Sequence, residues 1–276
     1  MPELLEVYTI LKQLEPHILN KPISRFSVSA KGLKLIAPEK PKSFFQKISG
    51  RSIVMVKRYG KFMVFLLDNE QQIVGHLRMS GRLTYSPKLL KHKHKRLHIK
   101  FAGAGYLNFI DVRRFGTFHL VSNIGNYQGL QNLGIDALSP ALSAEELYWK
   151  FQVTGKNIYK ALLDQAIIAG LGNIYVNEAL YATGIRPVKK AKKLSLQEVR
   201  QLLVNIRLIL KAAISFKGTT LLDKTYLDSG GETGKFYKRL RVYSREGKPC
   251  YKCKTLIKRV KIANRSAYYC PKCQKN

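Results

Sequence analysis

The sequence predicts an α+β, multi-domain protein in which a leading helix and a β-rich segment are followed by helices and a cysteine-rich end. Three observations support this prediction. The spacing of apolar residues changes from a helical to a strand pattern after the first twenty residues, two helix-start signatures occur in the second half, and all four cysteines lie in the last 27 residues. With 276 residues and 45% hydrophobic content, the chain can form two domains of ordinary size.

The first elements are a helix and a series of strands. An amphipathic helix is expected over residues 4–19, because apolar residues recur at helical spacing at Leu4, Val7, Ile10, Leu11 and Leu14. From about residue 22 to 121, short β-rich runs such as SIVMVKRYGKFMVFLL alternate with turn residues, which is typical of a β-sandwich or a barrel. Residues 122–140 are rich in Asn, Gly and Ser and are expected to be a linker.

Three or four helices are expected between Ser143 and Lys217. SAEE at residues 143–146 and SLQE at residues 195–198 both fit a capping box, in which a serine and a glutamate satisfy free amides of the first helical turn. The polar, glycine-rich stretch GTTLLDKTYLDSGGETGK follows at residues 218–235. It is too long for an ordinary connection, so it is either disordered or a functional loop.

The charge balance favours a nucleic-acid partner. The chain has 49 Lys and Arg against 17 Asp and Glu, a formal net charge of +32 that is spread along its length. Neutralising phosphates releases counterions and drives binding, although an anionic membrane or structured RNA would attract the same charge. No stretch approaches eighteen apolar residues and no signal peptide begins the chain. We therefore expect a cytoplasmic protein without a membrane partner.

The cysteine spacing predicts one structural Zn²⁺ per chain. Cys250 and Cys253 form one C-x₂-C pair, and Cys270 and Cys273 form a second pair sixteen residues later. Two such pairs can provide a tetrahedral site that leaves no position open for catalysis. Two disulfides would need an oxidising compartment, which nothing else in the sequence supports. The intervening segment KTLIKRVKIANRSAYY is basic, so a zinc-held hairpin would be a nucleic-acid finger.

Two short motifs could carry chemistry or have ordinary structural roles. If Met1 is removed, Pro2 becomes a terminal secondary amine, which is a nucleophile, and the carboxyl group of Glu3 lies beside it. Taken alone, the same dipeptide is more typical of an ordinary helix start. The turn GLGNIY at residues 170–175 could present backbone amides and Asn173 to a phosphate, or it could be a simple corner between two helices.

Other candidates lie in the β-rich segment. Met79 and Phe115 follow expected strands and could wedge between bases beside Arg113, or they could belong to the core. His94 lies in the basic run KHKHKR, which by itself is typical of a solvated face, and Lys61 by itself would be a surface lysine.

Taken together, these motifs resemble those of the formamidopyrimidine-DNA glycosylases, also called Fpg or MutM. The motifs PEL-EV, HL-MSG, D-RRFG, GLGNIY-NEALY-GI, KGTTL and the four-cysteine finger occur in the family order and at the family spacing. The resemblance implies an N-terminal β-sandwich with a leading helix, a helix-two-turn-helix domain and a C-terminal zinc-finger β-hairpin. We place these domains at residues 1–125, 126–235 and 236–276.

The resemblance also implies roles for individual residues. Pro2 would attack the sugar C1′ and Glu3 would be the neighbouring acid and base, while Glu6 matches another acidic position of the opening motif. Lys61 would assist β-elimination and Arg265 the second elimination. Residues around 219–235 would close over the extruded base. The implied DNA-binding residues are Met79, His94, Arg113, Phe115, Lys156 and Asn173.

The implied activity is that of a bifunctional glycosylase and AP lyase of base excision repair, acting on 8-oxoguanine and formamidopyrimidines. Its partner would be double-stranded DNA with oxidised bases or abasic sites, and the enzyme would be a monomer in the bacterial cytoplasm, associated with the nucleoid. An endonuclease VIII-type enzyme for oxidised pyrimidines and a non-catalytic binder of damaged DNA are the alternatives. Leu5 replaces a usual proline and Arg78 a usual glycine, which puts substrate preference and rate in question.

Overall fold

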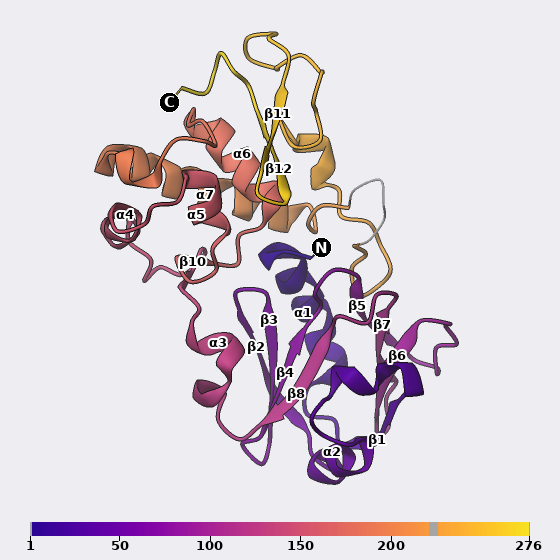
Figure 1. The fold of residues 1–276 in the computed structure, drawn as a ribbon. Coiled ribbons are helices and arrows are strands. Elements are labelled where there is room, and N and C mark those ends of the chain that lie inside the picture. The colour runs from indigo at the N-terminus through magenta and orange to yellow at the C-terminus, as the bar shows by residue number, and fades with distance from the viewer. Residues whose placement is uncertain (1, 221–225, 276) are drawn as a thin grey trace. The chain divides into compact units, whose positions relative to one another are not determined.

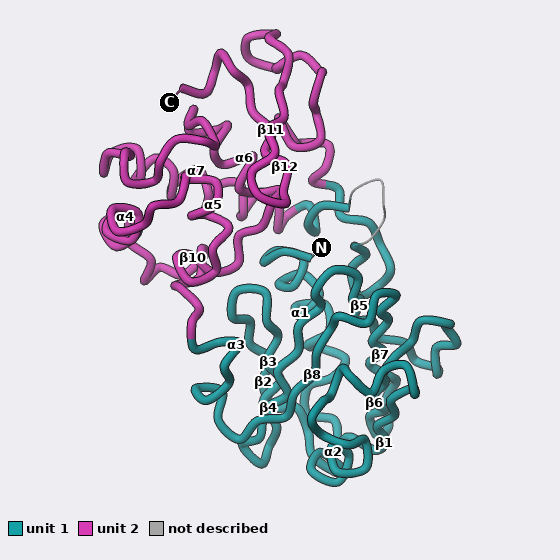
Figure 2. Tube along the Cα trace, viewed as in Figure 1, with its two compact units in different colours: residues 1–131, 216–235 teal, residues 132–215, 236–276 magenta. Residues whose placement is uncertain are grey.

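The computed structural model describes residues 2–220 and 226–275, which form two compact units (Figures 1 and 2). Unit 1 comprises residues 1–131 and 216–235, and unit 2 comprises residues 132–215 and 236–276. Internal contacts thus group residues 216–235 with the N-terminal part, whereas the sequence expectation grouped them with the helices. The finger residues likewise share a unit with the helices, from which the sequence expectation had separated them.

Unit 1 is built around two four-stranded antiparallel sheets. Their strand orders are β1-β6-β7-β5 and β2-β3-β4-β8. The first sheet contains β1 (Ile23–Val28), β6 (Lys95–Phe101), β7 (Tyr106–Asp111) and β5 (Gly81–Ser86), and the second contains β2 (Ile53–Tyr59), β3 (Phe62–Leu67), β4 (Gln72–His76) and β8 (Thr117–Val121).

The sandwich core follows from the alternation of side chains along these strands. In β6, Leu97, Ile99 and Phe101 are buried, and Leu97 pairs with Phe109 of β7. One continuous apolar cluster contains residues of both sheets and of the first helix. The predicted β-sandwich with a leading helix is confirmed, and in the described residues the two sheets do not join into a barrel.

Helix α1 (Leu4–Ile18) lies along this core, close to the predicted range of residues 4–19. All five apolar residues that predicted it are buried. Leu5 occupies the second position of the helix, where the amide has no helical partner and a proline is also tolerated. The departure from the family motif at Leu5 therefore leaves the helix start intact. Unit 1 also contains η1 (Ala30–Leu35), α2 (Pro41–Ile48), η2 (Ile124–Asn126) and α3 (Gln128–Gln131).

The expected linker at residues 122–140 is partly structured, because it includes η2, α3 and the short strand β9 (Ile135–Asp136). Strand β9 pairs in parallel with β10 (Ile168–Ala169) in unit 2. A two-residue strand and a one-turn helix carry too little periodicity to be recognised in the sequence.

The expected helices of unit 2 are α4 (Ala144–Gln152), α5 (Ile158–Leu163), α6 (Asn173–Thr183) and α7 (Leu196–Ser215), with short turns η3 (Ala191–Lys193) and η4 (Phe236–Arg239). At the start of α7, Glu198 N donates to Ser195 Oγ at 3.2 Å and Ser195 N donates to Glu198 Oε2 at 2.8 Å, which is the predicted capping box. At α4, Ser143 Oγ accepts from Glu146 N at 3.0 Å.

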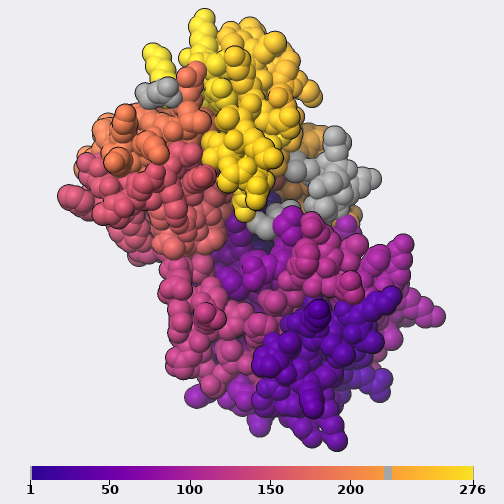
Figure 3. All heavy atoms as spheres, in the orientation of Figure 1, coloured from indigo at the N-terminus to yellow at the C-terminus, as the bar shows by residue number. Residues whose placement is uncertain are grey.

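The C-terminal finger is the hairpin of β11 (Lys258–Ile262) and β12 (Arg265–Tyr269), paired in antiparallel register. Strand β12 packs against α6, and the space-filling view shows the yellow finger residues lying against helices of the same unit (Figure 3).

Among residues 2–220 and 226–275, no helix combines the length and apolar character needed to cross a membrane.

Candidate active site and nucleic-acid interface

The first candidate cluster lies at the N-terminal end of α1. Pro2 is buried, and Glu3 and Glu6 are only 3% and 1% exposed. The backbone N–H of Glu3 donates to Glu6 Oε2 at 2.8 Å, which fixes the first residues before the helix. Two carboxyl groups with little access to bulk water therefore lie within a few residues of Pro2.

The second carboxylate oxygen of Glu6 connects this cluster to a distant part of the sequence. Glu6 Oε1 accepts from the N–H of Thr219 at 3.0 Å. Gly218 has φ +80°, and a Cβ at this position would lie 2.8 Å from Glu6 Oε1. Glycine is required here for both reasons, and so Gly218 and Thr219 can approach the head of α1 closely.

Lys61 lies in the turn between β2 and β3 and is 7% exposed, so it is not an ordinary surface lysine. Its charge contributes to the environment of His76 at the end of β4, which is also 7% exposed. Burial, followed by the charges of Arg78 and Lys61, lowers the pKa of His76 to about 3. His76 is therefore neutral, and its Nδ1 accepts from the N–H of Arg78 at 2.9 Å.

Met79 and Phe115 are surface residues, with 40% and 53% of their area exposed. The interpretation that they belong to the core is therefore wrong. The guanidinium carbon of Arg113 lies 5.1 Å from the centroid of the Phe115 ring. Two large apolar side chains and a cation are thus accessible on two turns of unit 1, which suits contact with bases.

Both turns are held by Asp111, which is completely buried and was not singled out from the sequence. Its Oδ1 accepts from Ser80 Oγ at 2.5 Å and from Arg113 N at 3.1 Å, and its Oδ2 accepts from Gly116 N at 2.9 Å. This carboxylate joins the Met79 turn to the turn that carries Phe115. Its position as the first residue of D-RRFG was the only sequence signal for this role.

His94 lies beside the same turn region. Its Nδ1 is 3.0 Å from Nη2 of Arg96, and Arg96 Nε donates to the carbonyl of Asp111 at 2.8 Å. Burial, followed by the charges of Lys93 and Arg96, lowers the pKa of His94. His94 is partly exposed, whereas the neighbouring lysines at 91 and 93 are exposed.

Asn173 and Arg265 belong to unit 2 and are brought together there. Asn173 Nδ2 donates to the carbonyl of Ser266 at 3.3 Å, and the hydroxyl of the buried Tyr159 donates to the same carbonyl at 3.0 Å. Tyr159 also donates to Asn173 Oδ1. Arg265 precedes Ser266 and is exposed at the tip of the β11–β12 hairpin. The helix corner and the finger thus form one local surface.

Lys156 lies apart from this network, in the loop before α5. Its Nζ forms an ion pair with Asp164. Its side chain is 46% exposed and remains accessible to solvent.

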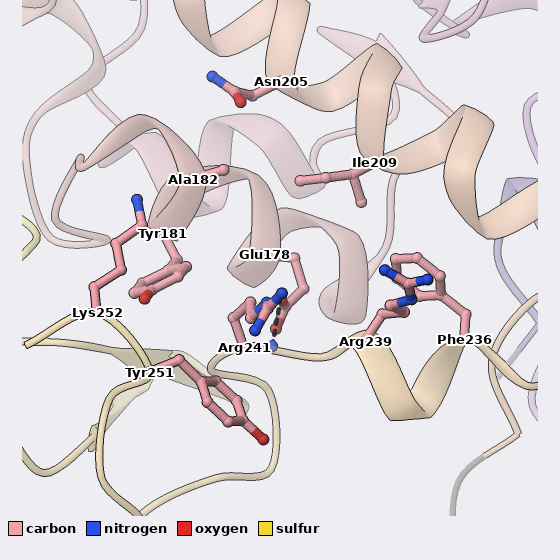
Figure 4. Close-up of a pocket in the computed structure, with 10 residues that line it drawn as sticks. All are labelled: Glu178, Tyr181, Ala182, Asn205, Ile209, Phe236, Arg239, Arg241, Tyr251 and Lys252. Carbon is pink, nitrogen blue, oxygen red and sulfur yellow. Dashed lines mark hydrogen bonds between the residues drawn. The ribbon is translucent and has the colours of Figure 1, made fainter. Parts of the chain in front are cut away.

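Glu178 of α6 ties the base of the finger to the helices. This carboxylate accepts from three successive backbone N–H groups, those of Arg241, Val242 and Tyr243, at 2.8, 3.0 and 2.9 Å. Burial raises its pKa although the hydrogen bonds oppose the shift. Glu178 lies at one wall of a cavity of about 530 Å³ between α6, α7 and the segment that leads to the finger, where Tyr181, Phe236 and Tyr251 are further lining residues (Figure 4).

The four cysteines form the predicted metal site. Their Sγ atoms all lie within 4.8 Å of one another, and none forms a disulfide. The Sγ–Sγ distances are 3.8 Å for Cys250 and Cys273 and 3.4 Å for Cys253 and Cys270. Zn–S bonds of about 2.3 Å in a tetrahedron place sulfurs about 3.8 Å apart, so these donors fit zinc. The hydroxyl of Tyr181 lies 3.2 Å from Cys250 Sγ, where it can donate to a thiolate.

The candidate residues thus fall into two groups. Unit 1 carries Pro2, Glu3, Lys61, Met79, His94, Arg113 and Phe115, and unit 2 carries Lys156, Asn173, Arg265 and the four cysteines. The middle of the expected base-covering loop, residues 221–225, lies outside the described residues.

Three family models match successive parts of the chain. Residues 1–118 match the formamidopyrimidine-DNA glycosylase N-terminal domain, residues 133–225 match its H2TH domain, and residues 247–276 match the zinc finger found in FPG and IleRS. The last match and the sulfur geometry together identify the cysteine cluster as a structural zinc site.

Full-length relatives show the same similarity. The chain is 38% identical to the formamidopyrimidine-DNA glycosylase of Shouchella clausii and 37% identical to that of Ureaplasma parvum, with at least 99% of each chain covered. Among solved structures, it is similar to Lactococcus lactis Fpg in complex with abasic-site DNA (TM-score 0.91, 30% identity, all of both chains covered) and to Thermus thermophilus MutM (TM-score 0.88, 33% identity, 99% and 98% covered). From its domains, its site and these relatives, the chain belongs to the formamidopyrimidine-DNA glycosylase family.

Proposed function

We propose that this DNA glycosylase of base excision repair removes oxidised purines, chiefly 8-oxoguanine and formamidopyrimidines, and then cleaves the DNA strand. Solved relatives support the substrate class. Lactococcus lactis Fpg has been crystallised with abasic-site DNA and with Fapy-dG DNA, and MutM with DNA containing carbocyclic 8-oxo-G. The net charge of +32 suits a double-stranded DNA partner.

The observation that carries the proposal is the arrangement at the head of α1. Pro2 and Glu3 are buried, and Glu6 binds the backbone of Glu3 with one oxygen and that of Thr219 with the other. An α-amino group has a pKa of about 8, so a useful fraction is neutral near pH 7. Once Met1 is removed, Pro2 supplies a secondary amine in a position that is held by hydrogen bonds.

The first reaction is base release. The lone pair of the Pro2 nitrogen forms a bond to C1′, the bond from C1′ to the base breaks, and the base leaves with a proton. Glu3 acts as the acid and base for the proton transfers that accompany these changes and the opening of the sugar ring. The product is an iminium ion, C1′=N⁺, between the sugar and Pro2.

Strand cleavage follows by two eliminations. The iminium acidifies the C2′ proton, and removal of this proton expels the 3′ phosphate, assisted by Lys61. A second elimination expels the 5′ phosphate, for which Arg265 binds and neutralises the phosphate. The two cleavages leave a one-nucleotide gap with phosphate ends.

The remaining candidates act in binding. Met79, Phe115 and Arg113 fill the space that an extruded nucleotide leaves, and His94, Lys156 and Asn173 bind the backbone. In this proposal, residues 1–125 carry catalysis, residues 126–235 grip the duplex and residues 236–276 supply the finger. The enzyme acts as a monomer on DNA of the bacterial nucleoid.

The test is a cleavage assay on duplexes that carry either 8-oxoguanine or an oxidised pyrimidine, followed by borohydride trapping. We expect faster cleavage of the purine lesion and a covalent adduct that maps to Pro2, because reduction fixes the iminium. A faster reaction on the pyrimidine lesion would identify an endonuclease VIII-type enzyme instead. Binding without cleavage of either duplex would identify a non-catalytic binder.

A chain that retains Met1 is the matched control. Its Pro2 nitrogen is an amide, whose lone pair is delocalised into the carbonyl and cannot attack. It should bind lesion DNA with unchanged affinity but form no adduct. An adduct that maps to Lys61 would contradict the assignment of Pro2.

A further inference from the structure

Helix α1 presents one polar face within an otherwise apolar surface. Glu6, Thr9 and Gln13 are spaced three and four residues apart, so their side chains lie on the same side of the helix. Glu6 is 1% exposed and Thr9 is 7% exposed. Burying polar groups is costly unless they have partners, so this face is expected to have a specific occupant.

The occupant is the return segment, by which we mean the described residues 216–220 and 226–235. Glu6 Oε1 binds the N–H of Thr219, as described above. The side chain of Thr9 lies near the hydroxyl of Tyr226, a residue that is 3% exposed and belongs to the sandwich core. The Tyr226 hydroxyl itself donates to the carbonyl of Lys217 at 3.1 Å. Two turns of α1 thus contact residues on both sides of positions 221–225.

Gln13 makes the last and most elaborate of these contacts. Its Nε2 donates to Asp228 Oδ2 at 2.8 Å, and its Oε1 accepts from both the N–H and the hydroxyl of Ser229, at 3.1 and 2.8 Å. We call these three residues the Gln13 clamp. Asp228 is 1% exposed, and its other oxygen, Oδ1, accepts from the N–H groups of Gly230 and Glu232 at 3.1 and 2.8 Å.

Thr220 joins the two sides of the return segment to each other. Its hydroxyl donates to the carbonyl of Tyr226 at 2.9 Å and accepts from the N–H of Gly234 at 2.8 Å. The Gln13 clamp therefore holds the part of the return segment after position 225 directly. Through Thr220 it also restrains the part before position 221, which Glu6 binds. The backbone of Thr219 is connected to that of Glu3 by the two oxygens of a single carboxylate.

We propose that the Gln13 clamp is a positioning device that sets the return segment against the damaged base while Pro2 attacks the sugar. This inference rests on the proposed function. The base is bonded to the C1′ that Pro2 attacks, and Thr219 is held beside Glu3, so the base lies alongside the return segment during its release. An abasic sugar has no base. The clamp therefore governs base release and leaves the cleavage of a preformed abasic site unaffected.

The hydrogen-bond pattern allows a polarity exchange as the test. Gln13→Glu replaces a donor by a carboxylate that faces Asp228, so the clamp opens through repulsion. Adding Asp228→Asn supplies an amide nitrogen in place of Oδ2, while Oδ1 still accepts from Gly230 and Glu232. The hydrogen bond between residues 13 and 228 is then restored with its donor and acceptor exchanged, while the other side-chain oxygen at position 13 still accepts from Ser229.

Three quantities are measured under single-turnover conditions: base release from an 8-oxoguanine duplex, strand cleavage of a preformed abasic duplex, and affinity for undamaged duplex. We expect Gln13→Glu to slow base release about tenfold or more, since small displacements of a reacting group cost one to two orders of magnitude. Abasic cleavage and affinity should stay within about twofold of wild type. The double variant should recover base release to within about threefold. Lys12→Met, which changes a neighbouring exposed side chain, is the control and should leave all three unchanged.

Other results would overturn the proposal. Equal losses on both substrates would show that the clamp only maintains the fold. No loss in the single variant, or a double variant no better than the single one, would show that the Gln13–Asp228 contact does not position the segment. A wild-type protein that cleaves abasic DNA but releases no oxidised purine would instead refute the proposed substrate, which separates that failure from a failure of the clamp.

Discussion

The side chain of Asn173 donates to the backbone carbonyl of Ser266, and Tyr159 donates to the same carbonyl. A residue at the start of α6 and a buried tyrosine of α5 thus fix the backbone beside Arg265. Removing the Tyr159 hydroxyl leaves the partly buried Ser266 carbonyl and the Asn173 side chain with one hydrogen bond fewer each, and the first prediction follows from this loss.

Tyr159→Phe should lower the free energy of unfolding by about 1–2 kcal/mol, the usual effect of losing a buried hydrogen bond. It should also reduce the share of fully eliminated product, because Arg265 is less well placed. Chemical denaturation and gel analysis of the cleavage products measure the two effects. Tyr148→Phe is the control, since its hydroxyl has no hydrogen bond among residues 2–220 and 226–275. Equal product ratios in both variants would contradict this role of Tyr159.

Zinc affinity should depend on Tyr181. Its hydroxyl lies 3.2 Å from Cys250 Sγ, and hydrogen bonds to ligands usually change metal affinity tenfold or more. We expect Tyr181→Phe to bind zinc about tenfold more weakly in chelator competition, with one zinc still bound per chain at saturation. Tyr251→Phe alters an exposed tyrosine that lines the cavity of Figure 4 together with Tyr181, and it should bind zinc like wild type.

Cys270→Ala should lose the zinc and, with it, strand cleavage.

Arg78 occupies a position that favours glycine. Its φ is 53°, in the left-handed region, where a side chain costs about 1 kcal/mol. Arg78→Gly should therefore raise the free energy of unfolding by up to about 1 kcal/mol. Part of this gain is lost because glycine increases the entropy of the unfolded chain. Arg82→Gly, at a strand residue with ordinary backbone angles, should destabilise the protein. A less stable Arg78→Gly variant would show that the Arg78 side chain makes contacts that outweigh the strain.

Stability should fall on acidification because of His76. Its pKa is about 3 in the folded state and about 6.5 when unfolded, so below pH 6.5 the unfolded state binds a proton that the folded state does not. Between pH 7 and pH 5 this linkage removes about 2 kcal/mol, and the loss continues down to about pH 3. Glutamine does not titrate in this range, so the free energy of unfolding of His76→Gln should fall less between pH 7 and pH 5 in denaturant titrations. Parallel pH profiles for the two proteins would rule out a neutral, buried His76.

Phe115 should act in lesion processing more than in general affinity. Its ring is 53% exposed and stacks with Arg113, so Phe115→Ala should slow base release while binding to undamaged duplex changes little. Val112→Ala, which shortens another exposed apolar side chain of the same turn, is the matched control. Similar losses of affinity and of base release would mean that Phe115 serves only as a contact to duplex DNA.

Local patterns were sufficient to predict much of this molecule. The helix at residues 4–19, the serine cap and capping box, and the two cysteine pairs each depend on residues within one or two turns, and each is found in the structure. Features that depend on contacts between distant residues could not be predicted. Gln13 binds Asp228, 215 positions away, and Glu178 binds backbone amides more than sixty residues later.

The exposure of Met79 and Phe115 illustrates the same limit. Their apolar side chains fit a core as well as a surface, and the difference lies in Asp111, whose hydrogen bonds build the turns that point them outward. A single aspartate in a sequence gives no sign of accepting hydrogen bonds from three residues. Lys61 presents the reverse case, because a lysine that is usually exposed is here almost fully buried.

The discontinuous make-up of unit 1 has a consequence for synthesis on the ribosome. Tyr226 is part of the sandwich core, yet it follows the whole helical segment from residue 132 to 215. The N-terminal sandwich emerges first but lacks this ring, and the polar face of α1 lacks its partners, until more than four-fifths of the chain has been translated. The surroundings of Pro2, the proposed nucleophile, are therefore completed only when the polypeptide is nearly full length, and a truncated product that ends before the return segment lacks the hydrogen bond from Thr219 to Glu6.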